Sequence, residues 1–83
     1  MRFIFSRAAS RQFQKLPREA QKRIDDKLRF YLAQRDPLDF AEPVKDPRFG
    51  NWKFRIGEWR VLFDVEGDTI IVLKVGHRRS VYA

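Results

Sequence analysis

The sequence contains no cysteine and only one histidine, and these two shortages exclude most metal and redox chemistry. Without cysteine there is no disulfide, no thiolate nucleophile and no zinc–thiolate site. The single histidine, His77, rules out histidine-rich metal sites as well. The longest apolar runs are four residues, at 30–33 and 70–73, too short to cross a membrane, and the N-terminus does not resemble a signal peptide. We therefore expect a cytoplasmic protein that works without a cofactor.

What the sequence does contain is an excess of positive charge on a short chain. Its 83 residues include 18 Lys and Arg against 11 Asp and Glu, a formal net charge of +7. Hydrophobic residues make up 43% of the chain, which is enough for one compact core. We expect a single domain over residues 1–83, because neither half would bury a core alone. The charge points to a polyanionic partner, either a nucleic acid or an acidic protein.

The charge is unevenly distributed along the chain. Residues 1–35 carry ten basic and three acidic side chains, and residues 48–83 carry seven and four. Residues 36–47 reverse the balance, with one Lys against four acidic residues, and they hold three of the four prolines. Since proline lacks an N–H donor and disfavours helix at the preceding residue, we interpret this middle stretch as an extended connector.

Before the connector, apolar residues recur at helical spacing. Residues 1–5 are apolar and aromatic, as in a strand, and Ser6 is suited to cap the helix that follows. Pro17 suits the first turn of a second helix. The apolar faces consist of Ala9, Phe13 and Leu16 in the first helix and Ala20, Ile24, Leu28, Tyr31 and Leu32 in the second. The pattern predicts a helical hairpin.

After the connector the apolar spacing changes to two, which is typical of half-buried strands. Strands are expected at 52–56, 59–65 and 69–75, joined by two-residue turns at Gly57-Glu58 and Gly67-Asp68, because glycine tolerates positive φ. The sequence thus predicts an α+β fold in the order β-α-α-β-β-β. The helical hairpin would pack on one face of a small antiparallel meander sheet.

The alternation assigns each strand residue to one face of the sheet. The face expected in the core contains Trp52, Phe54, Ile56, Trp59, Val61, Phe63, Val65, Ile70 and Val72. On the other face Arg55 lies opposite Arg60, with Lys53 beside them. Like charges at cross-strand distance destabilise a sheet by up to about 1 kcal/mol.

No acidic residue close in sequence offsets these three cations, since Asp64 lies towards the other end of its strand. An external anion would supply the compensation, because the arginine fork matches the oxygens of a phosphate. The alternative is a solvated face on which the long side chains splay apart.

Three segments, in this order, resemble the RelE/ParE superfamily, the toxins of bacterial type II toxin–antitoxin systems. They are the basic and aromatic strand at 52–56, WRVLFDV at 59–65 and the ending VGHRRSVY at 75–82. The resemblance covers essentially the whole chain and implies the RelE branch more strongly than the ParE branch. RelE-type toxins are metal-independent endoribonucleases (mRNA interferases) that cut mRNA at the ribosomal A site and so inhibit translation.

The resemblance also implies site residues. The catalytic candidates are Lys53, Arg55, Arg60, His77, Arg78 and Tyr82, and the RNA-binding candidates are Arg18, Lys22, Arg29 and Arg79. In these roles Arg60 would clamp phosphate, Lys53 would act as general base and Tyr82 would stack on a base. Arg78, favoured by the family match, or His77, which suits proton transfer near neutral pH, would protonate the leaving group. Known members often have lysine at the position of His77, and many continue past that of Tyr82 into a helix.

Structural roles are the alternative for several of these residues. His77 would then be an exposed loop residue, and Tyr82 would cover the apolar patch of Leu62, Ile71 and Leu73. The basic face of the second helix would be a solvated surface.

The expected partners follow from charge and from the resemblance. We expect a cognate antitoxin from an adjacent gene, with a segment that folds on binding. The other partners would be mRNA in the ribosomal A site, ribosomal RNA, and operator DNA only as a toxin–antitoxin complex, with no membrane. The alternative functions are a ParE-like inhibitor of DNA gyrase without nuclease chemistry and an inactive homologue that only binds its antitoxin.

Overall fold

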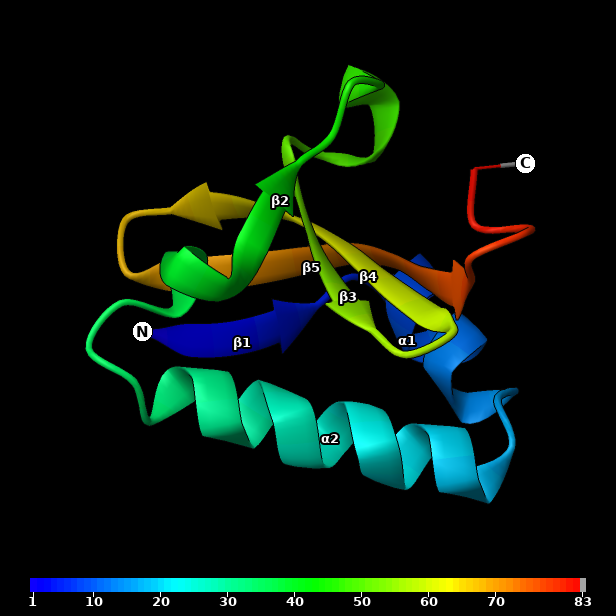
Figure 1. The fold of residues 1–83 in the computed structure, drawn as a ribbon. Helices are drawn as coiled ribbons and strands as arrows, with labels where there is room; N and C mark the ends of the chain where they lie inside the picture. Colours follow the sequence, from blue (N-terminus) through cyan, green and yellow to red (C-terminus); the bar gives the residue numbers. More distant parts are fainter. Residues whose placement is uncertain (83) are drawn as a thin grey trace.

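Two helices cover one face of a five-stranded sheet in the computed structural model, which describes residues 1–82 (Figure 1). The elements in chain order are β1 (Arg2–Phe5), α1 (Arg7–Gln14), α2 (Arg18–Leu32), the 3-10 helix η1 (Pro37–Phe40), β2 (Ala41–Pro43), the 3-10 helix η2 (Pro47–Phe49), β3 (Trp52–Ile56), β4 (Trp59–Glu66) and β5 (Thr69–His77). The strand order across the sheet is β1-β5-β4-β3-β2. The predicted α+β class, the two helices and the three-stranded meander are confirmed.

Both helices begin where the local sequence supplies a start. Ser6 is the N-cap of α1, and its Oγ accepts a hydrogen bond from the Ala9 amide at 3.1 Å. Pro17 is the N-cap of α2, one residue before the first-turn position that we expected. Gln12 attaches α1 to the sheet, because its Oε1 accepts a hydrogen bond from the Val75 amide at 2.9 Å, past the point where β1 stops pairing with β5. The predicted hairpin is thus fixed to the sheet by both packing and hydrogen bonding.

The sheet is mixed rather than purely antiparallel, because β1 runs parallel to β5 while all other neighbours are antiparallel. Gly57 and Gly67 take φ values of 59° and 61° in the two expected turns. In the β3–β4 ladder Arg55 pairs with Arg60 and Lys53 pairs with Leu62, as predicted. The cross-strand position of the two arginines is therefore confirmed.

A β-bulge in the β4–β5 ladder changes which residues of β5 share a face. The register shifts immediately after Leu62, so that Leu62 pairs with Lys74 and Arg60 pairs with Gly76. An uninterrupted ladder, which the sequence analysis assumes, is wrong over this half of the strand. Because one extra residue reverses the alternation, Val75 is buried in the core and Lys74 takes the opposite face.

The proline-rich connector contains a strand and two 3-10 helices that the sequence analysis does not predict. β2 pairs antiparallel with β3 and places Glu42 opposite Lys53. The side chains of Asp36 and Asp46 cap the two 3-10 helices. Proline is tolerated here because β2 is an edge strand, and Pro43 is its last residue.

The main core lies between the sheet and the helices. Tyr31, Phe54 and Phe63 stack with successive ring centroids 4.5 Å apart, and Phe54 and Phe63 are fully buried. Burial raises the pKa of the Tyr31 hydroxyl above its ordinary value. Trp52 and Trp59, which we expect in the core, are half-buried and pack against its edge. The observed core face of β3 and β4 is the predicted one.

Replacing Phe54 with Ala tests this face assignment. The substitution removes the ring at the centre of the aromatic stack, and we expect it to lower the free energy of unfolding by about 3–5 kcal/mol in urea denaturation. Phe30→Ala is the control, because Phe30 is 49% exposed, and we expect it to cost about 1 kcal/mol. Equal losses in the two variants would contradict the assignment.

Candidate functional site

The face of the sheet away from the helices, here called the open face, gathers the three predicted cations. Lys53 and Arg55 on β3 and Arg60 on β4 all alternate with the buried residues Phe54 and Val61. The three side chains therefore leave the sheet on the same side. The structure confirms this grouping, which is the geometric basis of the candidate site.

An acidic residue offsets one of the three charges, contrary to the expectation that none lies nearby. Glu42 on β2 has its Oε1 3.2 Å from Arg55 Nε. The N–H does not point at this oxygen, which has no hydrogen-bond partner, so the contact is an ion pair without a hydrogen bond. Sequence reasoning missed Glu42 because strand β2 was not predicted.

Arg60 keeps its charge while its guanidinium is held in place. Its Nη1 donates hydrogen bonds to the carbonyl oxygens of Gly57 at 2.7 Å and Trp59 at 2.8 Å. Within residues 1–82 it makes no ion pair with a carboxylate. Carbonyl acceptors orient an arginine without cancelling its charge, so Arg60 presents a fixed positive group on the open face.

Lys53 is the second cation on this face that no carboxylate in the described part of the chain pairs with. Its Nζ lies 3.4 Å from the Tyr82 hydroxyl and 5.9 Å from the centre of the Tyr82 ring. Tyr82 is 40% exposed. The predicted association of the C-terminal tyrosine with the basic strand is therefore present in the structure.

Lys74 is a further cation on the open face that sequence reasoning missed. The bulge pairs it with Leu62, which also pairs with Lys53 from the other side. Its Nζ lies 4.0 Å from the centre of the Phe49 ring, a cation–π contact. No simple periodicity would have identified Lys74, because an unbroken alternation assigns it to the core face.

The C-terminal turn folds back over the open face and brings Arg78 to the β3–β4 turn. The Arg78 amide donates to the Glu58 carbonyl at 2.8 Å, and Arg78 Nε lies 2.8 Å from Glu58 Oε2. Val81 is 1% exposed and packs beside Gly76, while Leu62 on the same face is fully buried. The open face thus has a small apolar centre of its own, and Arg60 and Arg78 converge on one turn.

His77 lies apart from the open-face cations. It pairs with Trp59, whose side is the core side, and the two rings meet edge to face with centroids 5.5 Å apart. Its Nδ1 accepts a hydrogen bond from the Arg79 amide at 3.1 Å, and its Nε2 lies 3.5 Å from Glu58 Oε2. The structure therefore groups Arg78, but not His77, with the catalytic candidates on the open face.

The predicted RNA-binding residues of the second helix lie on the other side of the molecule. Arg18, Lys22 and Arg29 belong to α2, which covers the opposite face of the sheet (Figure 1). Lys22 Nζ is 2.8 Å from Asp26, and Arg29 Nε is 2.8 Å from Asp25. These exposed pairs fit the alternative of a solvated surface. Arg79 is exposed in the C-terminal turn.

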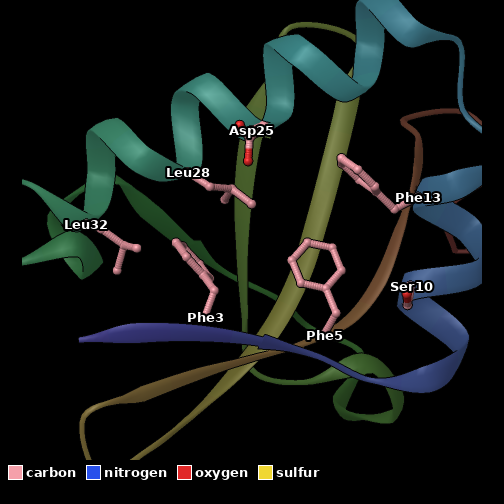
Figure 2. A pocket seen from close by; sticks show the side chains of 7 residues that line it. All are labelled: Phe3, Phe5, Ser10, Phe13, Asp25, Leu28 and Leu32. Atoms are coloured by element: carbon pink, nitrogen blue, oxygen red, sulfur yellow. The ribbon is translucent and has the colours of Figure 1, made fainter.

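A second, mainly apolar groove of about 400 Å³ lies between β1, α1 and α2 (Figure 2). It is lined by Phe3, Phe5, Ser10, Phe13, Asp25, Leu28 and Leu32. None of the predicted site residues lines it. Within residues 1–82, acidic and histidine side chains do not cluster in a way that would hold a metal ion. No helix in this part of the chain is long and apolar enough to cross a bilayer.

Replacing Glu58 with Gln tests how the C-terminal turn is held. The ion pair with Arg78 is lost while the side-chain shape is kept, and exposed pairs contribute about 0.2–1 kcal/mol. We expect amide hydrogen exchange at Val81 to become roughly two- to fivefold faster. Glu66→Gln is the control, because Glu66 is exposed at the far end of β4. Unchanged exchange at Val81 would contradict the role of Glu58.

Comparison with known proteins agrees with this geometry. The family model described as ParE toxin of type II toxin–antitoxin system, parDE, matches residues 3–82. Toxin RelG of Mycobacterium tuberculosis (strain ATCC 25618 / H37Rv) is 30% identical over 80 residues, which cover 94% of this chain and 91% of RelG. The crystal structure of the toxin–antitoxin complex RelBE2 from Mycobacterium tuberculosis contains a chain that matches with a TM-score of 0.72 and 27% identity, over 92% of this chain and 95% of that one. The resemblance drawn from the sequence is confirmed: the chain belongs to the ParE toxin family, within the RelE/ParE superfamily of type II toxin–antitoxin toxins.

Proposed function

We propose that this toxin is a metal-independent, ribosome-dependent endoribonuclease that cleaves mRNA and inhibits translation. The observation that carries the proposal is the pair of cations, Lys53 and Arg60, on the open face. Neither is paired with a carboxylate in the described part of the chain. Fixed positive groups of this kind stabilise the charge that develops on a phosphate during cleavage.

Cleavage of RNA without a metal needs three contributions. The 2′-hydroxyl loses a proton as its oxygen attacks phosphorus, the phosphorane charge is offset, and the 5′-oxygen gains a proton as its bond to phosphorus breaks. Arg60 is suited to the second task, since its guanidinium is oriented by two carbonyl oxygens. Lys53 is the candidate for the first task.

The candidate for the third task is Arg78. It lies at the same turn as Arg60, whereas His77 packs on Trp59 on the other side of the sheet. Of the two proton donors that the sequence left open, the geometry thus favours Arg78. Arg55 has a more limited role in this proposal, because Glu42 offsets its charge.

The proposed partner is a cognate antitoxin. The similar structure from Mycobacterium tuberculosis is a toxin–antitoxin complex, and the net charge of +7 suits an acidic partner. In this proposal operator DNA is bound only by the complex, and the free toxin acts on mRNA in the ribosomal A site. An adjacent gene is expected to encode the antitoxin.

The match to the ParE family model favours a second candidate function, inhibition of DNA gyrase without nuclease chemistry. A supercoiling assay with purified gyrase separates it from the first. Growth arrest on induction separates both from an inactive homologue that only binds its antitoxin.

Replacing Arg60 with Ala tests the ribonuclease proposal. We expect message cleavage in a translating extract, mapped by primer extension, to become about 10²–10³-fold slower, because the fixed charge at the phosphate is lost. Arg35→Ala is the matched control, since Arg35 is exposed beyond the end of α2 and distant in sequence from the open-face residues.

Intact message at doses of wild-type toxin that arrest growth would overturn the ribonuclease proposal, and loss of supercoiling at those doses would replace it with gyrase inhibition. Full cleavage by a folded Arg60→Ala variant would overturn the site assignment alone.

A further inference from the structure

A groove of about 380 Å³ lies beside the candidate site, between the segment that follows β2 and the C-terminal turn. Both segments rise on the side of the sheet away from α2 (Figure 1). The groove is lined by Pro43, Val44, Lys45, Asp46, Lys53 and Tyr82. Two of these residues, Lys53 and Tyr82, are catalytic candidates, so a ligand in the groove would reach the site directly.

One wall of the groove is an aromatic ring that is already held in place. Tyr82 is 40% exposed, and Lys53 contacts both its hydroxyl, at 3.4 Å, and its ring, at 5.9 Å from the centroid. A partly exposed ring with few rotatable bonds loses little conformational entropy when a flat group stacks on it. This wall therefore suits a planar apolar ligand.

The opposite wall has a fixed main chain. The Val44 amide donates to the Asn51 carbonyl at 2.9 Å, which anchors the segment to the residue before β3. Asp46 caps η2, and its Oδ1 accepts from the Arg48 amide at 3.0 Å. Pro43 and Val44 thus form a stable apolar surface across the groove from Tyr82.

The charges of the groove select an anion. Asp46 is the acidic residue among those lining it, and the Arg48 side chain donates to both of its carboxylate oxygens, at 2.6–3.1 Å. These hydrogen bonds lower the pKa of Asp46, so the carboxylate is ionised at neutral pH and its charge is offset by Arg48. Lys45 and Lys53 then leave the groove positive.

The size of the groove limits the ligand to a small one. Small-molecule sites span about 300–1,000 Å³, and this groove lies at the lower end of that range. A flat apolar ring that carries a negative group matches its two walls and its charge. A single nucleotide has this chemistry.

We propose that this groove binds one nucleotide of single-stranded RNA, with the base between Tyr82 and Val44 and a flanking phosphate at Lys45 and Lys53. The proposal rests on the proposed ribonuclease function for its ligand. It adds residues 43–45, on the segment that follows the unpredicted strand β2, to the surface that holds the message.

The test compares a short 2′-O-methyl RNA, which lacks the attacking hydroxyl, with the same oligomer missing one base at each position in turn. Binding is measured by fluorescence anisotropy. For the wild type we expect loss of the base at one position to weaken binding about tenfold, the effect of one base stacked on an aromatic side chain. Val44→Trp fills the groove, and we expect the intact and base-free oligomers to bind this variant equally.

A charge-reversal pair covers the case in which Val44→Trp does not fold. Lys45→Glu lies at the groove and Lys27→Glu lies on α2, and each lowers the net charge by the same amount. We expect Lys45→Glu to weaken binding of the intact oligomer by about tenfold and Lys27→Glu to leave it nearly unchanged. Equal effects of the two variants would overturn the groove as a nucleotide site.

Equal binding of intact and base-free oligomers to the wild type, or unchanged base dependence in folded Val44→Trp, would also overturn the groove. Message cleavage without base-dependent binding would overturn the groove and leave the ribonuclease proposal standing. Base-dependent binding that Val44→Trp abolishes, without message cleavage by the wild type, would support the groove and overturn the ribonuclease proposal.

Discussion

The apposition of Arg55 and Arg60 across the β3–β4 ladder is the constraint on which the site depends. A two-residue turn at Gly57 fixes the register and leaves the two side chains no choice of face. Like charges at this spacing cost up to about 1 kcal/mol, a sizeable fraction of the stability of a small domain. The chain compensates only part of this charge, since Glu42 pairs with Arg55 while Arg60 contacts carbonyl oxygens alone. The remaining positive charge is what an anion would neutralise.

The two faces of the sheet divide stability from function. On one face the stack of Tyr31, Phe54 and Phe63 joins the sheet to α2. On the other face the fully buried Leu62 lies between Lys53 and Lys74, so the cations stand around a rigid apolar centre. Segments from the two ends of the β3–β5 meander, the connector and the C-terminal turn, rise beside this face and frame it. Side chains supported in this way hold their geometry better than side chains on a free loop.

Much of this architecture follows from patterns that a short window of sequence contains. Alternation alone places Phe54 in the core and Arg55 outside it, and the glycine turns then set the β3–β4 register. Helical spacing identifies the buried faces of α1 and α2. These features are predictable because they depend on local periodicity and on the hydrophobic effect.

The features that sequence reasoning missed depend on interactions between distant segments. The bulge after Leu62 reverses the alternation of β5, and it decides that Lys74 joins the open face while His77 shares the side of Trp59. Strand β2 has only three residues, ends in proline and exists through its pairing with β3, so the position of Glu42 has no local signal. Both misses concern how strands pair, which periodicity within one strand does not encode.

The most direct test of this account is a nuclear magnetic resonance titration of the isotope-labelled toxin with a non-cleavable single-stranded RNA. The account predicts that the largest amide shifts fall on the open face, around Lys53, Arg60 and Lys74, and that they weaken with salt because the contacts are made to phosphate. Shifts confined to α2, around Arg18 and Lys22, would contradict it.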